Sequence, residues 1–183
     1  MPVLTLIAGP NGSGKSTFTL RVDLEGQDRL LDTDAIARRL NPSNPSAAAM
    51  EAGREVLKRI EEYLGSEVSF AVETTLSSRK YADLIRRAKS RGYEIHLVFI
   101  GVDSAETSIA RVRVRAALGG HSVPDADVRR RYERSLANCA KALRLVDYCR
   151  LYDNSGDGHR LILVARAGAI VCRSESLPQW AEL

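Results

Sequence analysis

A glycine-rich loop near the start of the chain contains the first residues whose types and spacing could do chemistry. The stretch LIAGPNGSGKSTF, residues 6–18, carries the pattern G-x-x-x-x-G-K-[ST]. Glycines let such a loop turn tightly and point N–H groups at phosphate oxygens, and the helix that follows adds its N-terminal dipole. The pattern predicts an ATP site formed by Gly9, Pro10, Asn11, Gly12, Ser13, Gly14, Lys15, Ser16 and Thr17.

Two residues of this loop have specific expected roles. Lys15 should reach the β- and γ-phosphates, and the Ser16 hydroxyl should bind Mg²⁺. The alternative is a plain glycine turn between a strand and a helix. An apolar run, VLTLIAG, precedes the loop and a helix is expected to begin at its end, which is the context that a phosphate-binding loop requires.

An acidic segment, LDTDAIA, follows the second expected strand. Asp34 lies just past the end of that strand, on the same rim as the loop, so its carboxylate could accept a proton from a substrate hydroxyl. The alternative is that Asp34 caps a helix over residues 35–40. Asp32 is expected to be a strand residue or a support.

A second polar segment, VETTL, ends the third expected strand on the same rim. Glu73 could hold a substrate hydroxyl or a magnesium-bound water, and Thr75 could hydrogen-bond the phosphate acceptor. The alternative is that Thr74 or Thr75 caps a helix that starts near Ser78.

Arginines concentrate in residues 104–146, where two helices are expected to form a hinged lid around GGHSVP. Arg111 and Arg115 are four residues apart and share a helix face, whereas Arg113 points elsewhere. We expect Arg111 and Arg115 to act on the γ-phosphate and His121 to be a hinge or substrate contact. Arg129, Arg130 and Arg131 stay open as alternatives to Arg115, and the whole cluster could instead be a solvated basic helix pair.

The remaining sequence predicts the elements that must position these residues. Short apolar runs alternate with helical segments, which indicates a parallel sheet covered on both faces. In the helix over 46–64 the apolar positions are Met50, Gly53, Val56, Leu57, Ile60 and Leu64. We expect a single α/β domain over residues 1–183. It should have the three-layer P-loop NTPase/kinase fold, with a mostly parallel sheet of about five strands, a helical lid and a C-terminal hairpin over 159–173 that turns at Ala167-Gly168.

Composition and charge restrict the class of protein. The chain is 44% hydrophobic and 27% charged, with a net charge of +4. It has no apolar run near 20 residues and no basic segment before its first apolar stretch, so we expect a cytoplasmic protein without a membrane partner. Cys139, Cys149 and Cys172 are widely spaced and are expected to be reduced structural thiols.

Other P-loop classes lack their second motifs here. There is no LSGGQ-like segment of an ABC ATPase and no N-K-x-D segment of a GTPase. A motor or AAA ATPase would carry four apolar residues followed by Asp-Glu, but in LVFIGVDS the acid Asp103 follows Gly101 and precedes Ser104. A small-molecule or nucleotide kinase needs only an acceptor site, a carboxylate base and mobile arginines.

The ordered segments GPNGSGKST, DTDAIA, VETTL, RVRVRAALGGHSVP…RRRY and LYDNS resemble the zeta toxin family of P-loop kinases, particularly its short bacterial members. The likeness covers residues 3–155. It implies transfer of the γ-phosphate of ATP to a small metabolite, with the 3′-hydroxyl of UDP-N-acetylglucosamine as the acceptor of better-known members. It also implies Lys15 as the phosphate-binding lysine, Asp34 as the general base, Glu73 and Thr75 on the acceptor side, and Arg111 as a transition-state arginine. Segments that bind the sugar nucleotide in longer members are not found.

Two other functions are alternatives. A nucleic-acid end kinase or RNA-binding ATPase would explain the basic charge. It is not favoured, because within the arginine cluster only Tyr132 could stack on a base. A nucleotide-binding module without transferase activity could instead bind an antitoxin protein, which the intact set of Lys15, Ser16 and Asp34 argues against.

Overall fold

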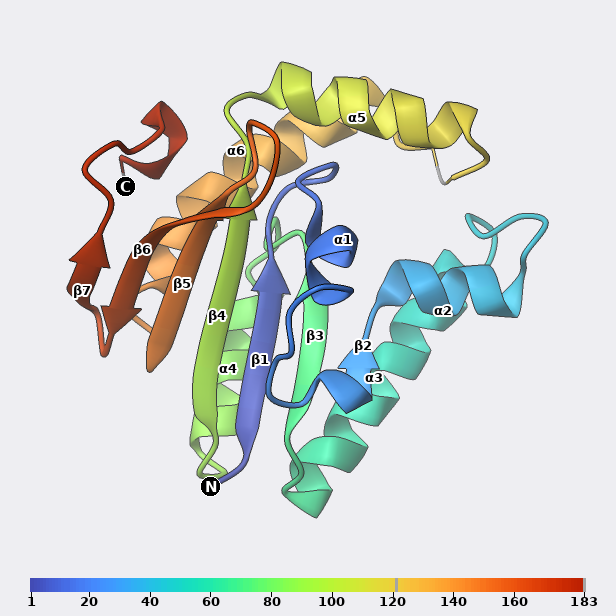
Figure 1. The fold of residues 1–183 in the computed structure, drawn as a ribbon. Coiled ribbons are helices and arrows are strands. Elements are labelled where there is room, and N and C mark those ends of the chain that lie inside the picture. The colour runs from blue at the N-terminus through green and yellow to red at the C-terminus, as the bar shows by residue number, and fades with distance from the viewer. Residues whose placement is uncertain (121, 183) are drawn as a thin grey trace.

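A seven-stranded sheet organises the chain (Figure 1). The computed structural model describes residues 1–120 and 122–182. The strands lie in the order β2-β3-β1-β4-β5-β6-β7. They span Val3–Ala8 (β1), Leu30–Leu31 (β2), Phe70–Thr74 (β3), Glu94–Gly101 (β4), Tyr148–Asp153 (β5), Arg160–Arg166 (β6) and Ala169–Arg173 (β7).

The first five strands pair in parallel, as the sequence predicts, so their carboxyl ends meet at one edge of the sheet. β6 and β7 pair antiparallel and extend the same sheet, which accounts for the strands beyond the expected five. The predicted hairpin is confirmed, with its turn at Ala167 and Gly168. Both turn residues have positive φ, of 46° and 79° respectively.

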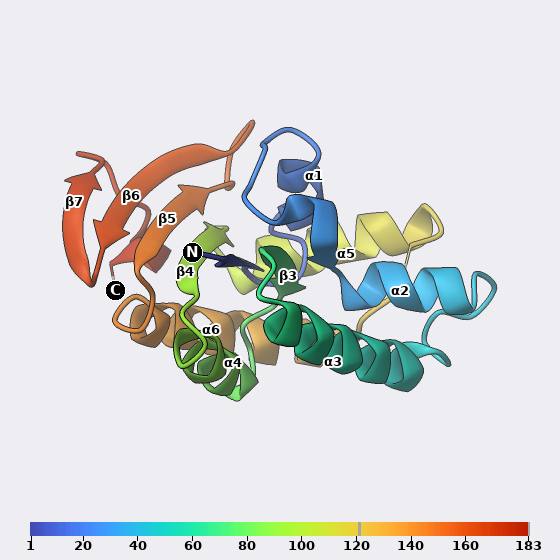
Figure 2. The same ribbon diagram turned by 90° about the horizontal axis from the view of Figure 1, so that it is seen from below.

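Helices cover the two faces unequally (Figure 2). The helices span Lys15–Thr19 (α1), Thr33–Leu40 (α2), Ala49–Ser66 (α3), Lys80–Lys89 (α4), Ala105–Ala117 (α5) and Asp125–Ala142 (α6). On one face lie α3, α4 and α6, whereas the other face carries only the short α1 and the loop that follows it. α5 lies across the carboxyl edge of the strands. No helix in the described ranges is both long and apolar enough to cross a bilayer.

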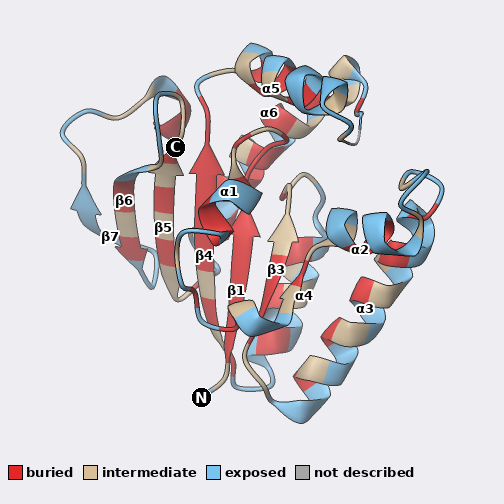
Figure 3. Cartoon of the chain, turned by 45° about the vertical axis from the view of Figure 1, so that its right-hand side comes forward, coloured by how far each residue is buried: buried red, intermediate tan, exposed pale blue. Residues whose placement is uncertain are grey.

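The core follows this asymmetry. The larger cluster lies between the sheet and α3, α4 and α6 and includes Leu4, Phe70 and Phe99. A smaller cluster under α1 is built around Phe18. Buried residues concentrate on the central strands, whereas all five residues of β7 are exposed (Figure 3). The sheet is therefore held mainly from one side.

Several element boundaries differ from the predictions. β2 has only two residues, because Asp32 is the N-cap of α2 and its carboxylate accepts the Asp34 N–H at 2.8 Å. Asp32 is thus not a strand residue, and Asp34 lies in the first helical turn rather than capping it. α1 is short and ends at Thr19.

The buried stripe of α3 is also narrower than predicted. Its buried residues are Ala52, Val56, Ile60 and Leu64, spaced four apart. Met50 and Leu57 are 72% and 54% exposed. A helix beside the edge strands of a sheet buries one side only. The small residue Ala52 therefore lies in the buried stripe, whereas the larger Met50 and Leu57 that the sequence pattern favoured lie outside it.

The segment after β7 returns to the end of β4. Trp180 is 6% exposed, and its indole packs on Phe99 and against the backbone of Gly101. Its Nε1–H donates to Asp153 Oδ1 at 3.0 Å. Gly101 is required here because a Cβ would lie 2.4 Å from the Trp180 ring.

Candidate active site

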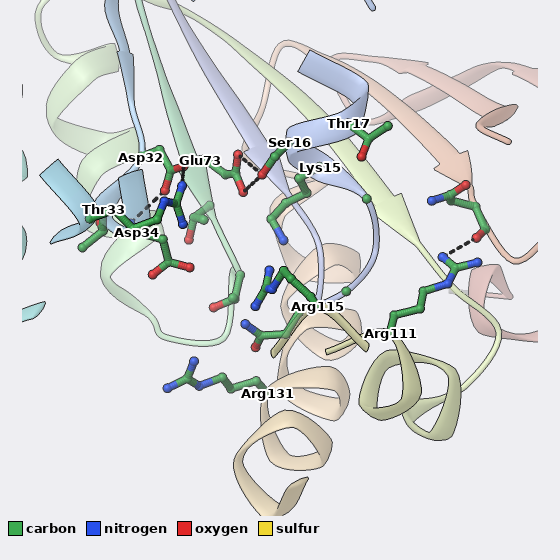
Figure 4. Close-up of a pocket in the computed structure, with 17 residues that line it drawn as sticks. Lys15, Ser16, Thr17, Asp32, Thr33, Asp34, Glu73, Arg111, Arg115 and Arg131 are labelled. Atoms are coloured by element: carbon green, nitrogen blue, oxygen red, sulfur yellow. Dashed lines mark hydrogen bonds and ion pairs between the residues drawn. The ribbon is translucent and has the colours of Figure 1, made fainter. Parts of the chain in front are cut away.

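The predicted chemical groups line one cavity at the carboxyl edge of the parallel strands (Figure 4). Its volume is about 560 Å³. Ligands of open parallel sheets bind at this edge. The lining residues are Asn11, Gly12, Gly14, Lys15, Ser16, Thr17, Asp32, Thr33, Asp34, Arg38, Glu73, Thr74, Thr75, Arg111, Arg115, Arg131 and Asn154.

The glycine-rich loop has a backbone that larger residues could not adopt. Gly14 precedes α1 with a φ of 89°, and a Cβ there would lie 2.4 Å from the Asn154 amide nitrogen. The Asn154 amide nitrogen donates to Ser13 O at 2.9 Å, and His159 Nε2 donates to Gly14 O at 3.2 Å. The segment after β5 therefore braces the loop.

Three residues predicted to bind nucleotide do not line the cavity: Gly9, Pro10 and Ser13. The carbonyls of Gly9 and Pro10 instead accept hydrogen bonds from Lys15 Nζ at 2.9 and 3.0 Å. Ser13 is completely buried. These three residues therefore support Lys15 and the loop rather than face the cavity.

Lys15 is buried at the base of the cavity, with 8% of its surface exposed. Burial lowers the pKa of its ammonium, which the charges of Glu73 and Asp34 partly offset. An ammonium that has already lost its water and faces a polar cavity gains most from an anionic ligand. This geometry suits the contact with phosphate that the sequence predicts.

Ser16 and Glu73 form the next part of the site. The Ser16 hydroxyl donates to the Glu73 carboxylate, with oxygen distances of 3.3 and 3.4 Å. Hydroxyl and carboxylate oxygens are ligands that Mg²⁺ accepts. The residues present therefore fit a magnesium ion that is also held by nucleotide phosphates.

The Glu73 carboxylate is electrostatically unusual. Burial raises its pKa above the ordinary value of 4.5, and the charges of Asp32 and Asp34 act in the same direction. Lys15 and the Ser16 hydroxyl act in the opposite direction. A carboxylate that is costly to ionise binds a cation or a proton readily, which suits a group beside a metal and an acceptor hydroxyl.

Asp34 lies on α2, on the side of the cavity opposite α5 (Figure 4). Its side chain is free of the capping role, which Asp32 takes. Asp32 also lies 3.9 Å from Arg38. The local sequence thus leaves one carboxylate of the DTD segment available to a ligand.

Thr75 is positioned by an unusual backbone at the residue that follows it. Leu76 has a φ of 56°, a backbone conformation that is unfavourable for a branched residue. The Leu76 side chain is buried. The Asn138 amide on α6 donates to Leu76 O at 2.7 Å. Thr75 is not a helix cap, because α4 begins at Lys80. The Thr75 hydroxyl instead lies 2.8 Å from the Ser77 hydroxyl.

The arginines of the lid region separate into two groups. Arg111, Arg115 and Arg131 line the cavity, and Arg111 Nη1 donates to Asn154 O at 2.8 Å. Three more make ion pairs away from it: Arg113 with Asp125, Arg129 with Glu106, and Arg130 with Asp127. The first two of these pairs link α5 to α6. Of the alternatives that the sequence left open, only Arg131 therefore joins Arg115 at the cavity.

Sequence reasoning missed Asn154 and His159, and it did not single out Arg38 or Thr33. Asn154 directly follows β5 in the segment LYDNS. A polar residue just past the end of a parallel strand lies on the ligand-binding rim, so its position was a usable signal. His159 lies in the following loop and packs edge-on against Phe18 with ring centroids 5.1 Å apart, a contact without any sequence signature. The predicted substrate contact His121 lies outside the described residues.

Solved structures share this fold at low sequence identity. A chain of the crystal structure of AvrRxo1-ORF1:-ORF2 with ATP aligns with a TM-score of 0.72 and 19% identity over 93% of this chain. The match spans only 60% of that longer chain. A structure from the PezAT chromosomal toxin-antitoxin system of Streptococcus pneumoniae aligns with a TM-score of 0.65 and 15% identity, over 92% of this chain and 75% of the other.

Sequence comparison identifies closer relatives. An uncharacterized protein of Haemophilus influenzae is 34% identical over 124 residues, which are 68% of this chain and 88% of the relative. A family model described as AAA domain matches residues 4–137, from β1 through most of α6. The matched range contains the phosphate-binding loop, all three acidic residues of the cavity and all three of the lid arginines that line it. The chain belongs to this AAA-domain family of P-loop proteins, although the segment LVFIGVDS lacks the Asp-Glu pair expected of an AAA ATPase.

Proposed function

We propose that the protein is an ATP- and magnesium-dependent phosphotransferase that moves the γ-phosphate of ATP to a hydroxyl of a small metabolite. The observation that carries this proposal is the shared cavity. The buried Lys15, the Asp34 carboxylate and four arginines, namely Arg38 and the three arginines of the lid region, face the same space. Simple nucleotide binding requires the loop but neither Asp34 nor Arg131.

Each side chain has a defined task in this reaction. Lys15 and the loop N–H groups hold the β- and γ-phosphates. Asp34 accepts the proton of the acceptor hydroxyl while the hydroxyl oxygen attacks the γ-phosphorus. The bond between the γ-phosphorus and the β–γ bridging oxygen breaks, so that ADP leaves. Arg111 and Arg115 stabilise the negative charge on the transferring group, and Thr75 orients the acceptor.

Magnesium would be held by Ser16, with Glu73 beside it. When bound, the ion neutralises phosphate charge and orients the transferring group. Glu73 keeps the Ser16 hydroxyl oriented through their hydrogen bond and holds a proton or a metal-bound water on the acceptor side.

The end of β4 supports transfer to an alcohol over simple ATP hydrolysis. P-loop hydrolases of the motor type place an Asp-Glu pair directly after four apolar residues. Here β4 ends at Gly101, which packs on Trp180, and Asp103 follows beyond it. The carboxylates that face the cavity come from α2 and β3 instead, where an acceptor would lie.

A UDP-sugar is the first acceptor to test, on the likeness to the zeta toxin family. Two of the solved neighbours, AvrRxo1-ORF1:-ORF2 and a structure from the PezAT toxin-antitoxin system, belong to two-component systems by name. We extend the proposal to a protein antitoxin for this chain on that likeness alone.

Mass spectrometry of purified protein incubated with Mg-ATP and a panel of alcohols tests the proposal. The panel should contain UDP-sugars, free sugars, nucleosides and polyols. We expect one acceptor to gain the mass of a phosphoryl group while ADP accumulates in equal amount. Lys15→Met should abolish both signals, and Lys58→Met on the exposed side of α3 should abolish neither. ADP formation without any phosphorylated acceptor would refute the transferase.

A further inference from the structure

The face of the sheet that carries α1 is only half covered. α1 and its loop cover β1 and β3, and no described helix lies over the amino-terminal halves of β4 and β5 or over the carboxyl-terminal half of β6 (Figures 1 and 2). Tyr152, near the carboxyl end of β5, packs on Phe18 of α1 with ring centroids 4.7 Å apart. Tyr148 begins β5 about 13 Å away along the strand, where this packing has ended.

Basic and aromatic side chains occupy the uncovered part. Strand pairing places His96, Tyr148 and Arg166 in one row across β4, β5 and β6. Arg150 lies one row further along β5 on the same face, opposite Val98, which belongs to the cluster under α1. We call these four residues, His96, Tyr148, Arg150 and Arg166, the basic sheet face.

The two guanidinium groups of the basic sheet face lie on the Tyr148 ring. Arg150 and Arg166 are 5.2 and 5.5 Å from its centroid, and the His96 ring is 5.5 Å from it on the neighbouring strand. Cation–π contact holds the arginines without using their N–H donors. The planar donor groups are therefore pre-positioned for a ligand.

The donors of both arginines lack acceptors. Within residues 1–120 and 122–182, neither the Arg150 nor the Arg166 side chain makes an ion pair or a hydrogen bond, and Arg150 Nε is buried without a partner. The nearby carboxylates are already engaged, Glu94 by His96 at 3.1 Å and Asp147 by Lys89 at 2.8 Å. A buried guanidinium N–H without an acceptor is costly, so this arrangement favours an external anion.

We propose that the basic sheet face binds the phosphate groups of a single-stranded nucleic acid. Arginine forks match phosphate geometry, and a flat strand surface with aromatic rings beside arginines is how sheets accept unpaired strands. The arginine cluster of residues 104–146 does not favour nucleic acid, because Tyr132 is its only residue that could stack on a base. In the basic sheet face, the side chains of every second residue of β5 point to the same side of the sheet. The pairing of β5 with β4 and β6 then brings these side chains next to residues that lie far away in the sequence.

Fluorescence anisotropy with a labelled 20-nucleotide polyuridine at 50 mM KCl tests this proposal. For single strands, the logarithm of affinity falls with the logarithm of salt concentration by about 0.7 per neutralised phosphate. Replacing both arginines in R150Q/R166Q should therefore reduce that slope by about 1.4 and weaken binding about 60-fold at this salt concentration. R166Q alone, at an exposed position, should weaken binding about eightfold.

A matched control separates the site from general charge. R91Q/R144Q removes the same charge from two exposed arginines in the turns that follow α4 and α6. It should leave binding within about threefold of the unchanged protein. Tyr148→Leu should weaken binding about tenfold, because it removes the aromatic support. Saturating Mg-ATP should not displace the RNA, because the face lies away from the cavity.

Five results would overturn the proposal. The first four are absence of binding at 50 mM KCl, equal losses in R150Q/R166Q and R91Q/R144Q, displacement by ATP, and equally strong competition by poly-glutamate. The last would assign the face to an acidic protein instead. Competition by millimolar inorganic phosphate with no gain from chain length would indicate a simple anion site and would also overturn the single-strand occupant. None of these readouts depends on phosphotransfer.

Discussion

Gly14 is the position where the phosphate-binding loop is most sensitive to its surroundings. Ala at this position would have to adopt a φ of 89°, which costs a residue with a Cβ about 1–2 kcal/mol. Its Cβ would also lie 2.4 Å from the Asn154 amide nitrogen and 3.1 Å from His159 Nε2. Asn154 would be pushed off Ser13 O, at a further cost of about 1 kcal/mol.

We therefore predict that Gly14→Ala lowers the free energy of unfolding by about 3 kcal/mol when the remaining clash is included. Asn154→Ala alone should cost about 1 kcal/mol, from the lost hydrogen bond. In the double variant the clash with the amide is gone, so the total should be about 2.5 kcal/mol rather than the 4 kcal/mol that additivity gives.

Urea denaturation measures these values, with the fluorescence of Trp180 as the probe. It is the single tryptophan of the chain and is buried, so its emission should shift to longer wavelength on unfolding. Titration with a fluorescent ATP analogue should show weaker binding for Gly14→Ala and partial recovery in the double variant. Additivity to within about 0.5 kcal/mol would refute the reasoning that Asn154 braces the loop.

Three further predictions follow from the same structure. Arg131→Gln should lower kcat/KM about 10–100-fold, because the cavity loses a charged donor. Arg130→Gln should leave kcat/KM within about twofold of the unchanged protein, because the Arg130 side chain pairs with Asp127. Steady-state kinetics distinguish the two variants, and equal effects would contradict the division of the lid arginines. The folded-state pKa of Glu73 lies above 4.5. As pH rises from 4.5 through that higher pKa, the free energy of unfolding of the unchanged protein should therefore fall relative to that of Glu73→Gln. Urea denaturation of both proteins at several pH values tests this, and parallel plots of unfolding free energy against pH would count against a desolvated carboxylate. Gly101→Ala should cost about 1–3 kcal/mol and expose Trp180 to water, and an unchanged emission spectrum would contradict its packing on β4.

The sequence predicted the fold well because its strongest signals are local. Short apolar runs that alternate with helical segments leave few topologies other than a parallel sheet, and the hairpin turn at Gly168 has a composition that only a turn accepts. The loop pattern placed Lys15 and Ser16 correctly, because spacing determines backbone geometry there. The rim position of Asp34, Glu73 and Thr75 followed from strand ends alone.

The rest depends on tertiary contacts that periodicity does not encode. Asp32 and Asp34 are equally good caps, and only the start of α2 decides that Asp32 takes this role. The consecutive Arg129, Arg130 and Arg131 are indistinguishable in sequence, and the placement of α6 against α5 turns one of them to the cavity. Asn154 acquires its role from strand order, which brings β5 beside β4 and next to the loop.

The most direct test of the account is the rate of phosphoryl transfer by Asp34→Asn once an acceptor is known. With Asp34 as the base, this rate should fall about 10²–10⁴-fold while ATP affinity changes less than about threefold. Asp83→Asn, an exposed change on α4, should match the unchanged protein in both measurements. A transfer rate in Asp34→Asn equal to that of the unchanged protein would contradict the central claim that this carboxylate activates the acceptor.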